Sequence, residues 1–389
     1  MGKQLFKFFS SLRLTVVCLA FGVVLVFLGT LAQVNEGLYQ AQTRWFRSFF
    51  IWWGPAGAGW HLPVFPGGYL IGGILLVNLI TAHIHRFQFT WKKFGIHLTH
   101  AGIILLLVGQ LATDMLSRES EIRFNKGETK QYSESARGHE LVFLTDAPDA
   151  ADDQVVAIPP SLLKPGGEIR SDNLPFTVRI QNYYINSRLR ERGPMVDTGP
   201  PPATQGIGPQ AVLMPMPEDR SMDGTNIPSA VIELTGPQGS LGTWLLSPDI
   251  SGGQDFMFGG KVWRVALRPQ RYYLPYTIQL LSTKFDVYPG TDTPKDYQSR
   301  VRIENPQRGE NREVDIYMNN PLRYQGLTFY QFQMPPIAAE SERWSALEVV
   351  RNPGWLTPYA GCVMVGAGMA YQFLLHLIGF VAKRRKVQV

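Results

Sequence analysis

The chain has 389 residues, of which 45% are hydrophobic and 17% are charged, a composition that excludes both an intrinsically disordered protein and a uniformly hydrophobic one. Its net charge of +6 does not indicate a nucleic-acid partner, because much of the excess lies in short basic clusters beside apolar runs, as the positive-inside rule predicts for membrane proteins. The two cysteines, Cys18 and Cys362, lie in apolar runs without a CxxC pair, which excludes a disulfide framework and a thiol oxidoreductase.

Residues 1–116 are predicted to form an N-terminal membrane domain with three transmembrane helices. The first, at about 14–34, is longer than the roughly 7–15-residue core of a secretory signal, so we expect an uncleaved helix. The second and third are predicted at 69–85 and 94–116, each long enough to cross a bilayer. Segment 35–62 is rich in aromatic residues, which favours an interfacial helix with its rings at the headgroup level. A ligand-binding surface is the alternative for that segment.

Residues 351–389 are predicted to hold a fourth transmembrane helix, Trp355–Val381, followed by a basic tail. Basic clusters lie at the N-terminus, at 86–93 and at 383–386, and all three satisfy the positive-inside rule together if they are cytoplasmic. The sequence therefore predicts a multi-pass protein of the inner (cytoplasmic) membrane with both termini in the cytoplasm.

Residues 117–350 are predicted to form a large extracytoplasmic all-β domain, inserted between the third and fourth helices, with two or three layers of strands. The predicted strands are Val155–Ile158, Phe176–Ile180, Ala230–Leu234, Thr243–Leu246, Val262–Leu267, Tyr276–Leu281 and Leu327–Phe332. Two similar segments, beginning at Leu174-Pro-Phe and Leu274-Pro-Tyr, hint at two sheet-forming halves. The Pro- and Gly-rich stretch Arg192–Arg220 indicates a long exposed loop, and Gly326 indicates a turn.

The chain contains no Walker loop, G-x-S-x-G elbow, H-E-x-x-H helix or G-x-G-x-x-G turn, so we expect no complete catalytic site in this chain alone. Candidate chemistry lies in the predicted membrane helices, where an ionisable residue marks a functional site by default. The histidines there are His83 and His85 in the second helix, His97 and His100 in the third, and His376 in the fourth. Spaced three apart, His97 and His100 share one helix face.

Depth separates these histidines. Counted from Lys93 and Lys383 at the helical rise, His100 and His376 each lie about 10 Å inside the membrane, whereas His97 lies about 6 Å inside. His85 is at the border, where it would face headgroups, and His83 is slightly deeper.

Two imidazoles at one depth on neighbouring helices can hold a haem iron from both sides. We therefore predict a haem site with His100 and either His376 or a partner residue as axial ligands, with His97 as a supporting or alternate ligand and with His83 also among the haem-binding residues. The alternative is that each imidazole only hydrogen-bonds the backbone of a neighbouring helix.

Several motifs carry a resemblance to a known family. They are Leu28-Gly-Thr-Leu-Ala-Gln33, Asn78-Leu-Ile-Thr-Ala-His-Ile84, His100-Ala-Gly-Ile-Ile-Leu-Leu-Leu-Val-Gly109, Pro294-Lys-Asp-Tyr-Gln-Ser299 and Asn320-Pro-Leu-Arg-Tyr-Gln-Gly-Leu-Thr-Phe-Tyr-Gln331. In these stretches the sequence resembles the ResB (CcsB) family of system II, the membrane proteins that take part in attaching haem to c-type cytochromes. Residues 190–225 and 235–260 look like insertions.

The resemblance implies a protein that moves haem b from the cytoplasm to the outer face of the membrane for attachment to the CxxCH motif of an apocytochrome c. It also implies a tryptophan-rich partner of the CcsA (ResC) type, along with the thiol-reducing proteins of the pathway. The transmembrane histidine of the family maps onto His100 through the spacing to Gly109. Two other readings remain open: a membrane-bound b-type cytochrome that passes electrons across the bilayer, and a structural scaffold of a respiratory complex.

Overall fold

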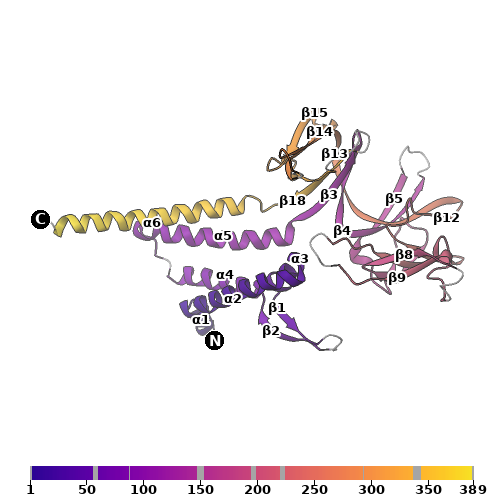
Figure 1. The fold of residues 1–389 in the computed structure, drawn as a ribbon. Helices are drawn as coiled ribbons and strands as arrows, with labels where there is room; N and C mark the ends of the chain where they lie inside the picture. The colour runs from indigo at the N-terminus through magenta and orange to yellow at the C-terminus, as the bar shows by residue number, and fades with distance from the viewer. Residues whose placement is uncertain are drawn as a thin grey trace. The chain divides into compact units, whose positions relative to one another are not determined.

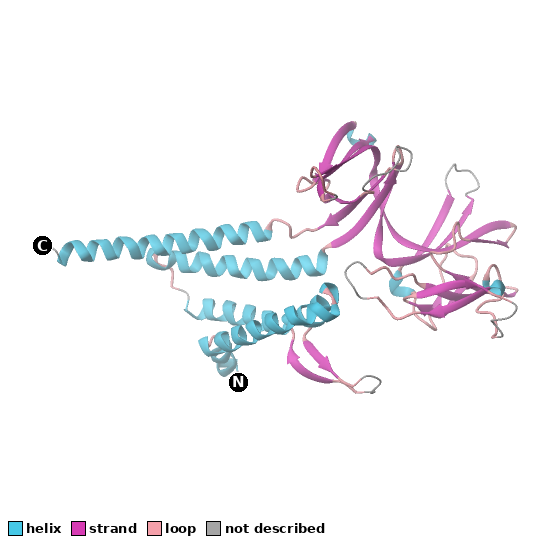
Figure 2. Ribbon diagram, in the orientation of Figure 1, coloured by secondary structure: helices cyan, strands magenta, loops and turns pink. Residues whose placement is uncertain are grey.

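The computed structural model describes residues 2–55, 60–86, 88–146, 153–193, 199–219, 224–291, 293–335 and 343–387. The chain divides into two compact units: Met1–Arg118 with Asn352–Val389, and Glu119–Asp219 with Gly224–Arg351. Along the sequence, long apolar helices precede and follow a large region built almost entirely of strands (Figures 1 and 2).

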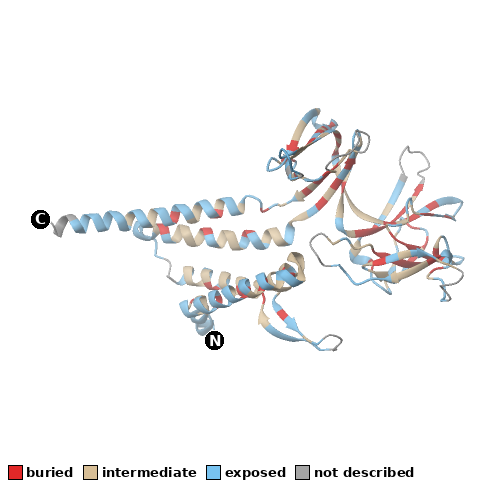
Figure 3. Cartoon of the chain, in the orientation of Figure 1, coloured by how far each residue is buried: buried red, intermediate tan, exposed pale blue. Residues whose placement is uncertain are grey.

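The helices of the first unit are α1 (Gly2–Phe9), α2 (Leu12–Glu36), α3 (Leu38–Ala41), α4 (Gly68–Arg86), α5 (Phe94–Leu116) and α6 (Thr357–Val387). Four of them, α2, α4, α5 and α6, are long and apolar enough to cross a membrane, three at the N-terminal end of the chain and one at the C-terminal end. Much of their length is coloured as exposed in Figure 3. The exposed residues include large apolar ones, for example Val23, which is 72% exposed, and Val363, which is 70% exposed. A multi-pass membrane protein is therefore indicated, as the sequence predicted.

The aromatic segment between α2 and α4 differs from the predicted interfacial helix. After α3, the π-helix Gln42–Phe46 leads into an antiparallel hairpin of β1 (Phe50–Trp53) and β2 (Leu62–Pro66). The aromatic residues that suggested a helix are also strong strand formers, and in β1 only Ile51 is buried. Residues 56–59, between the two strands, lie outside the described residues.

Helices α5 and α6 pack closely along a seam of small residues. Gly95, Gly102 and Gly109 recur every seventh residue of α5 and are its buried positions. A Cβ built on Gly102 would lie 2.8 Å from Val365 Cγ2 and 2.9 Å from the Gly361 carbonyl oxygen. Small residues that let two backbones approach are the usual way for membrane helices to pack.

Helix α4 is tied to the break between α1 and α2 by hydrogen bonds of Asn78. The Asn78 side chain donates to the Phe9 carbonyl oxygen at 2.6 Å and to the Ser11 carbonyl oxygen at 3.1 Å, and it accepts from the Thr15 hydroxyl at 2.6 Å. These bonds satisfy backbone carbonyls at the chain break in surroundings where an unpaired polar group is costly.

The second unit contains strands only, apart from short 3₁₀ turns, among its described residues. They are β3 (Arg118–Asn125), β4 (Thr129–Asp146), β5 (Asp153–Ile158), β6 (Glu168–Ile169), β7 (Thr177–Tyr184), β8 (Ser187–Glu191), β9 (Ala211–Pro215), β10 (Ser229–Gly236), β11 (Gly239–Leu246), β12 (Gln254–Phe258), β13 (Lys261–Val287), β14 (Pro294–Asn305), β15 (Glu310–Tyr317), β16 (Leu322–Tyr324), β17 (Leu327–Gln333) and β18 (Trp344–Arg351). A ten-stranded sheet has the order β15-β14-β13-β4-β3-β18-β17-β16, with β12 beside β13 and β5 beside β4. A four-stranded sheet has the order β11-β10-β7-β6, and β8 pairs with β9.

Two hydrophobic cores of this unit share the long strand β13. The segment that begins at Leu174 contributes Phe176, Val178 and Ile180 to the first core. The similar segment that begins at Leu274 contributes Tyr276, Ile278 and Leu280, at the equivalent positions, to the second. Each of the two similar segments thus belongs to one half of the β region.

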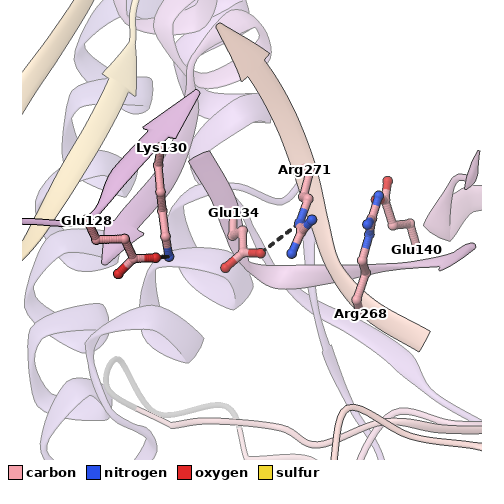
Figure 4. A network of polar contacts seen from close by, with 6 residues as sticks. All are labelled: Glu128, Lys130, Glu134, Glu140, Arg268 and Arg271. Carbon is pink, nitrogen blue, oxygen red and sulfur yellow. Dashed lines mark hydrogen bonds and ion pairs between the residues drawn. The ribbon is translucent and has the colours of Figure 1, made fainter. Parts of the chain in front are cut away.

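Strands β4 and β13 run side by side from one core to the other, joined by ion pairs (Figure 4). Glu134 accepts from Arg271 at 2.9 Å, and the nearly buried Glu140 accepts from Arg268 at 2.9 Å. The Glu140–Arg268 pair is the more buried of the two, and because an unpaired buried charge is costly, it favours this register of the two strands.

The stretch Arg192–Arg220, predicted to be a long exposed loop, is partly ordered. Its apolar residues Ala211–Pro215 form β9 and pair with β8. Ala203 and Ala211 are buried against Val231 and Leu245. Residues 194–198 and Arg220 lie outside the described residues.

The predicted turn at Gly326 is a two-residue hairpin loop that joins β16 to β17. Gln325 has φ 48° and Gly326 has φ 76°, and Tyr324 pairs with Leu327. Positive φ at both central residues is the mark of a type I′ turn. Nothing lies within 4 Å of a Cβ built on Gly326, so only the backbone conformation restricts this position.

Replacing Gly326 by Val is therefore expected to destabilise the protein by about 1–2 kcal/mol, the cost of a left-handed conformation for a residue with a Cβ. Thermal unfolding of the purified variants measures this effect. Gln325→Gly in the same turn is the control and is expected not to lower the melting temperature. A Gly326→Val protein that melts with the wild type would contradict the assignment of the turn.

Candidate functional site: a histidine-lined cavity

Three of the predicted site histidines meet near the connection between α4 and α5. His83 lies in the last turn of α4, and His97 and His100 lie one and two turns into α5. The ring centroids of His83 and His97 are 4.9 Å apart, and those of His83 and His100 are 5.9 Å apart. In both pairs the rings are nearly perpendicular. The antiparallel turn thus gathers His83, His97 and His100 into one cluster.

These histidines line a cavity of about 590 Å³ between α2, α4 and α5. The volume is within the range of roughly 300–1,000 Å³ that is usual for small-molecule sites. Leucine is the commonest residue of the wall, and the lining residues are Ser10, Leu12, Thr15, Leu19, Leu75, Asn78, Leu79, Ala82, His83, Lys93, Ile96, His97, His100, Ile103 and Leu107. A mostly apolar wall with a few polar groups is typical of a site for an amphipathic ligand.

The hydrogen bonds distinguish His97 from His100. His97 Nε2 is 3.1 Å from the Gln88 carbonyl oxygen, and because a carbonyl can only accept, this nitrogen donates. His97 therefore fits the reading of a histidine that bonds a neighbouring backbone. Within the described part of the chain, no hydrogen bond joins the His100 ring to another residue, and its ring contact is with His83. His100 is the member of the cluster best placed to offer a nitrogen to a ligand.

His376 lies apart from this cluster. The packing of Gly102 against Val365 puts His100 at about the level of Val365 on α6, and His376 lies eleven residues farther along, about 16 Å at the helical rise. Its ring is exposed and 3.2 Å from the Gln372 amide nitrogen. The expectation of equal depth for His100 and His376 is not met, because α6 runs on to Val387 and so Lys383 is not level with Lys93.

The other histidines are outside the cavity. His85 is exposed, with its ring 5.5 Å from the ring of Phe6, and His61 is exposed beside β2. His139, on β4, is buried, and this burial lowers the pKa of its imidazole, with a hydrogen bond to the Arg137 backbone acting in the opposite direction. None of the three contributes to the cluster.

Among the described residues, no group of three or more His, Cys, Asp or Glu side chains is arranged to hold a metal ion by itself. The cluster therefore does not resemble a fully protein-ligated ion site. A haem iron needs only one or two axial ligands from protein, because the macrocycle supplies the others. Imidazoles on the wall of an apolar cavity fit that requirement.

Several polar residues of the first unit were not predicted from the sequence. Lys93, Ser10 and Thr15 contribute to the cavity wall, and of these only Lys93 stood out, as a border charge. Asp114, in the last turn of α5, accepts from Arg47 at 2.7 Å and from the Tyr69 hydroxyl. Asp114 could have been singled out from the sequence, because a carboxylate inside a long apolar run is unusual in a membrane helix.

Comparison with known proteins agrees with the sequence motifs. Residues 263–339 match the ResB-like family. Protein NrfI of Wolinella succinogenes is 29% identical to this chain over 110 residues, which cover 28% of this chain and 12% of that protein. The chain thus spans about an eighth of the length of this relative. Residues 263–339 are thus similar to the ResB-like family, the family that the sequence motifs indicated.

Proposed function

We propose that this protein handles haem in the membrane during the maturation of c-type cytochromes, and that the cavity between α2, α4 and α5 holds the haem as cargo. The observation that carries the proposal is the meeting of His83, His97 and His100 on an apolar wall, with His100 making no hydrogen bond to the described residues. An imidazole on an apolar wall is a suitable axial ligand for haem iron.

His100 is the proposed axial ligand, on the strength of its place two turns inside α5 and its lack of hydrogen bonds. His97 is held by the Gln88 carbonyl and is the supporting or alternate ligand. The second axial ligand is then His83, whose ring faces that of His100, or a residue of a partner protein. His376 is too far along α6 to serve in the same chain.

The basic clusters support the direction of transport. The cavity includes Lys93 and lies at the end of the helices where residues 86–93 carry positive charge. The positive-inside rule places this end in the cytoplasm, together with both termini, and places the β region outside. Haem made in the cytoplasm would therefore meet the cavity first. A tryptophan-rich partner of the CcsA (ResC) type would present the haem to apocytochrome c, whose thiols other proteins of the pathway keep reduced.

The test is the haem content of the purified chain, alone and co-purified with its tryptophan-rich partner, measured by optical spectroscopy. We expect a b-type spectrum with about one haem in this chain's cavity, since a second set of gathered histidines is not present among the described residues. Protein that purifies without haem in both preparations, and does not bind added haem, would contradict the proposal.

A reporter fused after Val389 is expected to be active in the cytoplasm, and one at Gly206 only outside.

A further inference from the structure

Among the described residues that line the histidine-lined cavity, Lys93 is the only lysine or arginine. Lys93 is the N-cap residue of α5, immediately before Phe94, and it lies seven positions before His100, or about 10 Å along the helix at the usual rise. Its neighbour Lys92 is also exposed at this border but does not line the cavity. A lysine at the membrane border ordinarily extends toward the lipid headgroups, and Lys92, which is not part of the cavity wall, can do so. Lys93 therefore differs from Lys92 in lying on the cavity wall.

The Lys93 ammonium is hydrogen-bonded to Gln88, which also contacts the histidine cluster. Lys93 Nζ donates to the Gln88 side-chain oxygen at 2.8 Å, and the Gln88 backbone carbonyl accepts from His97 at 3.1 Å. Gln88 thus connects the lysine to the histidine cluster. An ammonium group has three donors, and among the described residues one of them is used. The remaining donors can bind an anion while the hydrogen bond to Gln88 is kept.

Apart from the histidines, the other polar groups of the wall are already hydrogen-bonded to the protein. Asn78 bonds Thr15 and the carbonyls of Phe9 and Ser11, and the Ser10 hydroxyl donates to the Lys7 carbonyl. Beyond these groups, the histidines and Lys93, the wall is apolar, with leucines at positions 12, 19, 75, 79 and 107. The cavity therefore has one cationic end, an apolar body and an imidazole between the two. Its positive end is also the N-terminus of α5, where the helix dipole favours an anion.

We propose that Lys93 binds a carboxylate of the ligand and so determines which edge of the ligand faces the cytoplasmic end of the cavity. The ligand class is a flat, apolar tetrapyrrole with carboxylate side chains, and in haem the group that pairs with Lys93 is a propionate. This inference rests on the proposed function, because it takes haem as the cargo. It adds a residue that orients the ligand without touching its iron.

The physical reason is the medium around Lys93. A charge pair at the edge of an apolar cavity is stronger than the same pair in water, because the effective dielectric constant is lower. A hydrogen bond between charged groups contributes enough that its loss lowers affinity by about 10- to 100-fold. An ester in place of the carboxylate removes the charge on the ligand side of the same pair.

The experiment is a haem titration of the full-length chain in lipid nanodiscs, followed by the shift of the Soret band. The proteins are the wild type, Lys93→Met, Lys93→Arg and Lys92→Met. Each is titrated with haem and with haem dimethyl ester. We expect Lys93→Met to bind haem about 10- to 100-fold more weakly than the wild type does. Lys93→Arg and Lys92→Met are expected to bind haem within a few-fold of the wild type.

The ester separates the carboxylate contact from other effects of the substitution. The wild type is expected to bind the ester as weakly as Lys93→Met binds haem, and Lys93→Met is expected to bind both ligands equally. If Lys93 instead binds a lipid phosphate, the wild type will bind acid and ester alike, which overturns the inference. Haem affinity that is unchanged in Lys93→Met also overturns it. A wild type that binds no haem overturns the proposed function itself, so the two failures are distinguishable.

Discussion

Replacing His100 by Ala is expected to remove bound haem from the purified protein and to stop the maturation of c-type cytochromes in cells. His100 lies two turns into α5 on the cavity wall, and no hydrogen bond to a described residue occupies its ring. Loss of a group that only supports a metal ligand typically costs about 10- to 100-fold in affinity, and loss of the ligand itself is expected to exceed that. The measurements are the haem-to-protein ratio and the b-type spectrum, and added imidazole should restore part of both by filling the vacant position.

Two other histidines serve as matched controls for this variant. His85 is an exposed neighbour of the cluster that does not line the cavity, and His376 lies about 16 Å along α6 from the level of His100. Ala substitutions at both positions are expected to leave the haem content unchanged. His83→Ala should change the spectrum if His83 is the second axial ligand and should leave it unchanged if a partner supplies that ligand. A His100→Ala protein with a full b-type spectrum would show that the axial assignment is wrong.

The sequence predicts the long helices well because a membrane helix is mostly a matter of apolar length. The helix that ends at Leu116 was predicted to its exact bounds, and the ends of the others differ by a few residues. The axial register between helices cannot be obtained in this way. The prediction assumed that the basic residues at the ends of the helices lie at the same depth in the membrane. The axial register of α5 and α6 is instead set by the contacts of Gly95, Gly102 and Gly109. This is why the predicted pairing of His100 with His376 differs from the structure.

The cavity itself is a tertiary feature that no local pattern reveals. His83, His97 and His100 could be grouped from the sequence because they flank one short turn. The contribution of α2 could not be predicted, since it depends on Asn78 holding the α1–α2 break against α4. Lys93 could be recognised as a border charge, but not as a wall residue.

In the β region, the predicted strands are apolar ones, whereas strands with charged faces are missed because the charges hide the alternation. The apolar strand β9 was also missed, because it lies in a stretch rich in Pro and Gly. β15 (Glu310–Tyr317) was missed because its outward positions are occupied by charged residues. The two predicted strands Val262–Leu267 and Tyr276–Leu281 are parts of the single strand β13. Pro269 and Pro275 suggested a break, because proline cannot donate to a ladder, but the pairing with β4 shifts register around both and continues.

Replacing Arg47 by Ala is expected to destabilise the first unit, because it leaves the Asp114 carboxylate without its charged partner. Arg47 Nε is 2.7 Å from Asp114 Oδ1, and the Asp114 side chain is only 6% exposed. Asp114 lies in the last turn of α5, where the helix dipole disfavours a negative charge. The arginine therefore offsets both the burial of the Asp114 carboxylate and its unfavourable position at the end of the helix. Removing one partner of a buried ion pair costs on the order of 3 kcal/mol, toward the low end here because Arg47 is half exposed.

The decisive comparison is between the single variant Arg47→Ala and the double variant Arg47→Ala with Asp114→Asn. An asparagine can keep a hydrogen bond with the Tyr69 hydroxyl, which donates to Asp114 in the wild type, while removing the uncompensated charge. We therefore expect the double variant to recover most of the melting temperature lost by the single variant, measured in the same detergent. Equal losses in the two proteins would mean that Arg47 stabilises the fold through the packing of its side chain, and that the charge of Asp114 has no part in it.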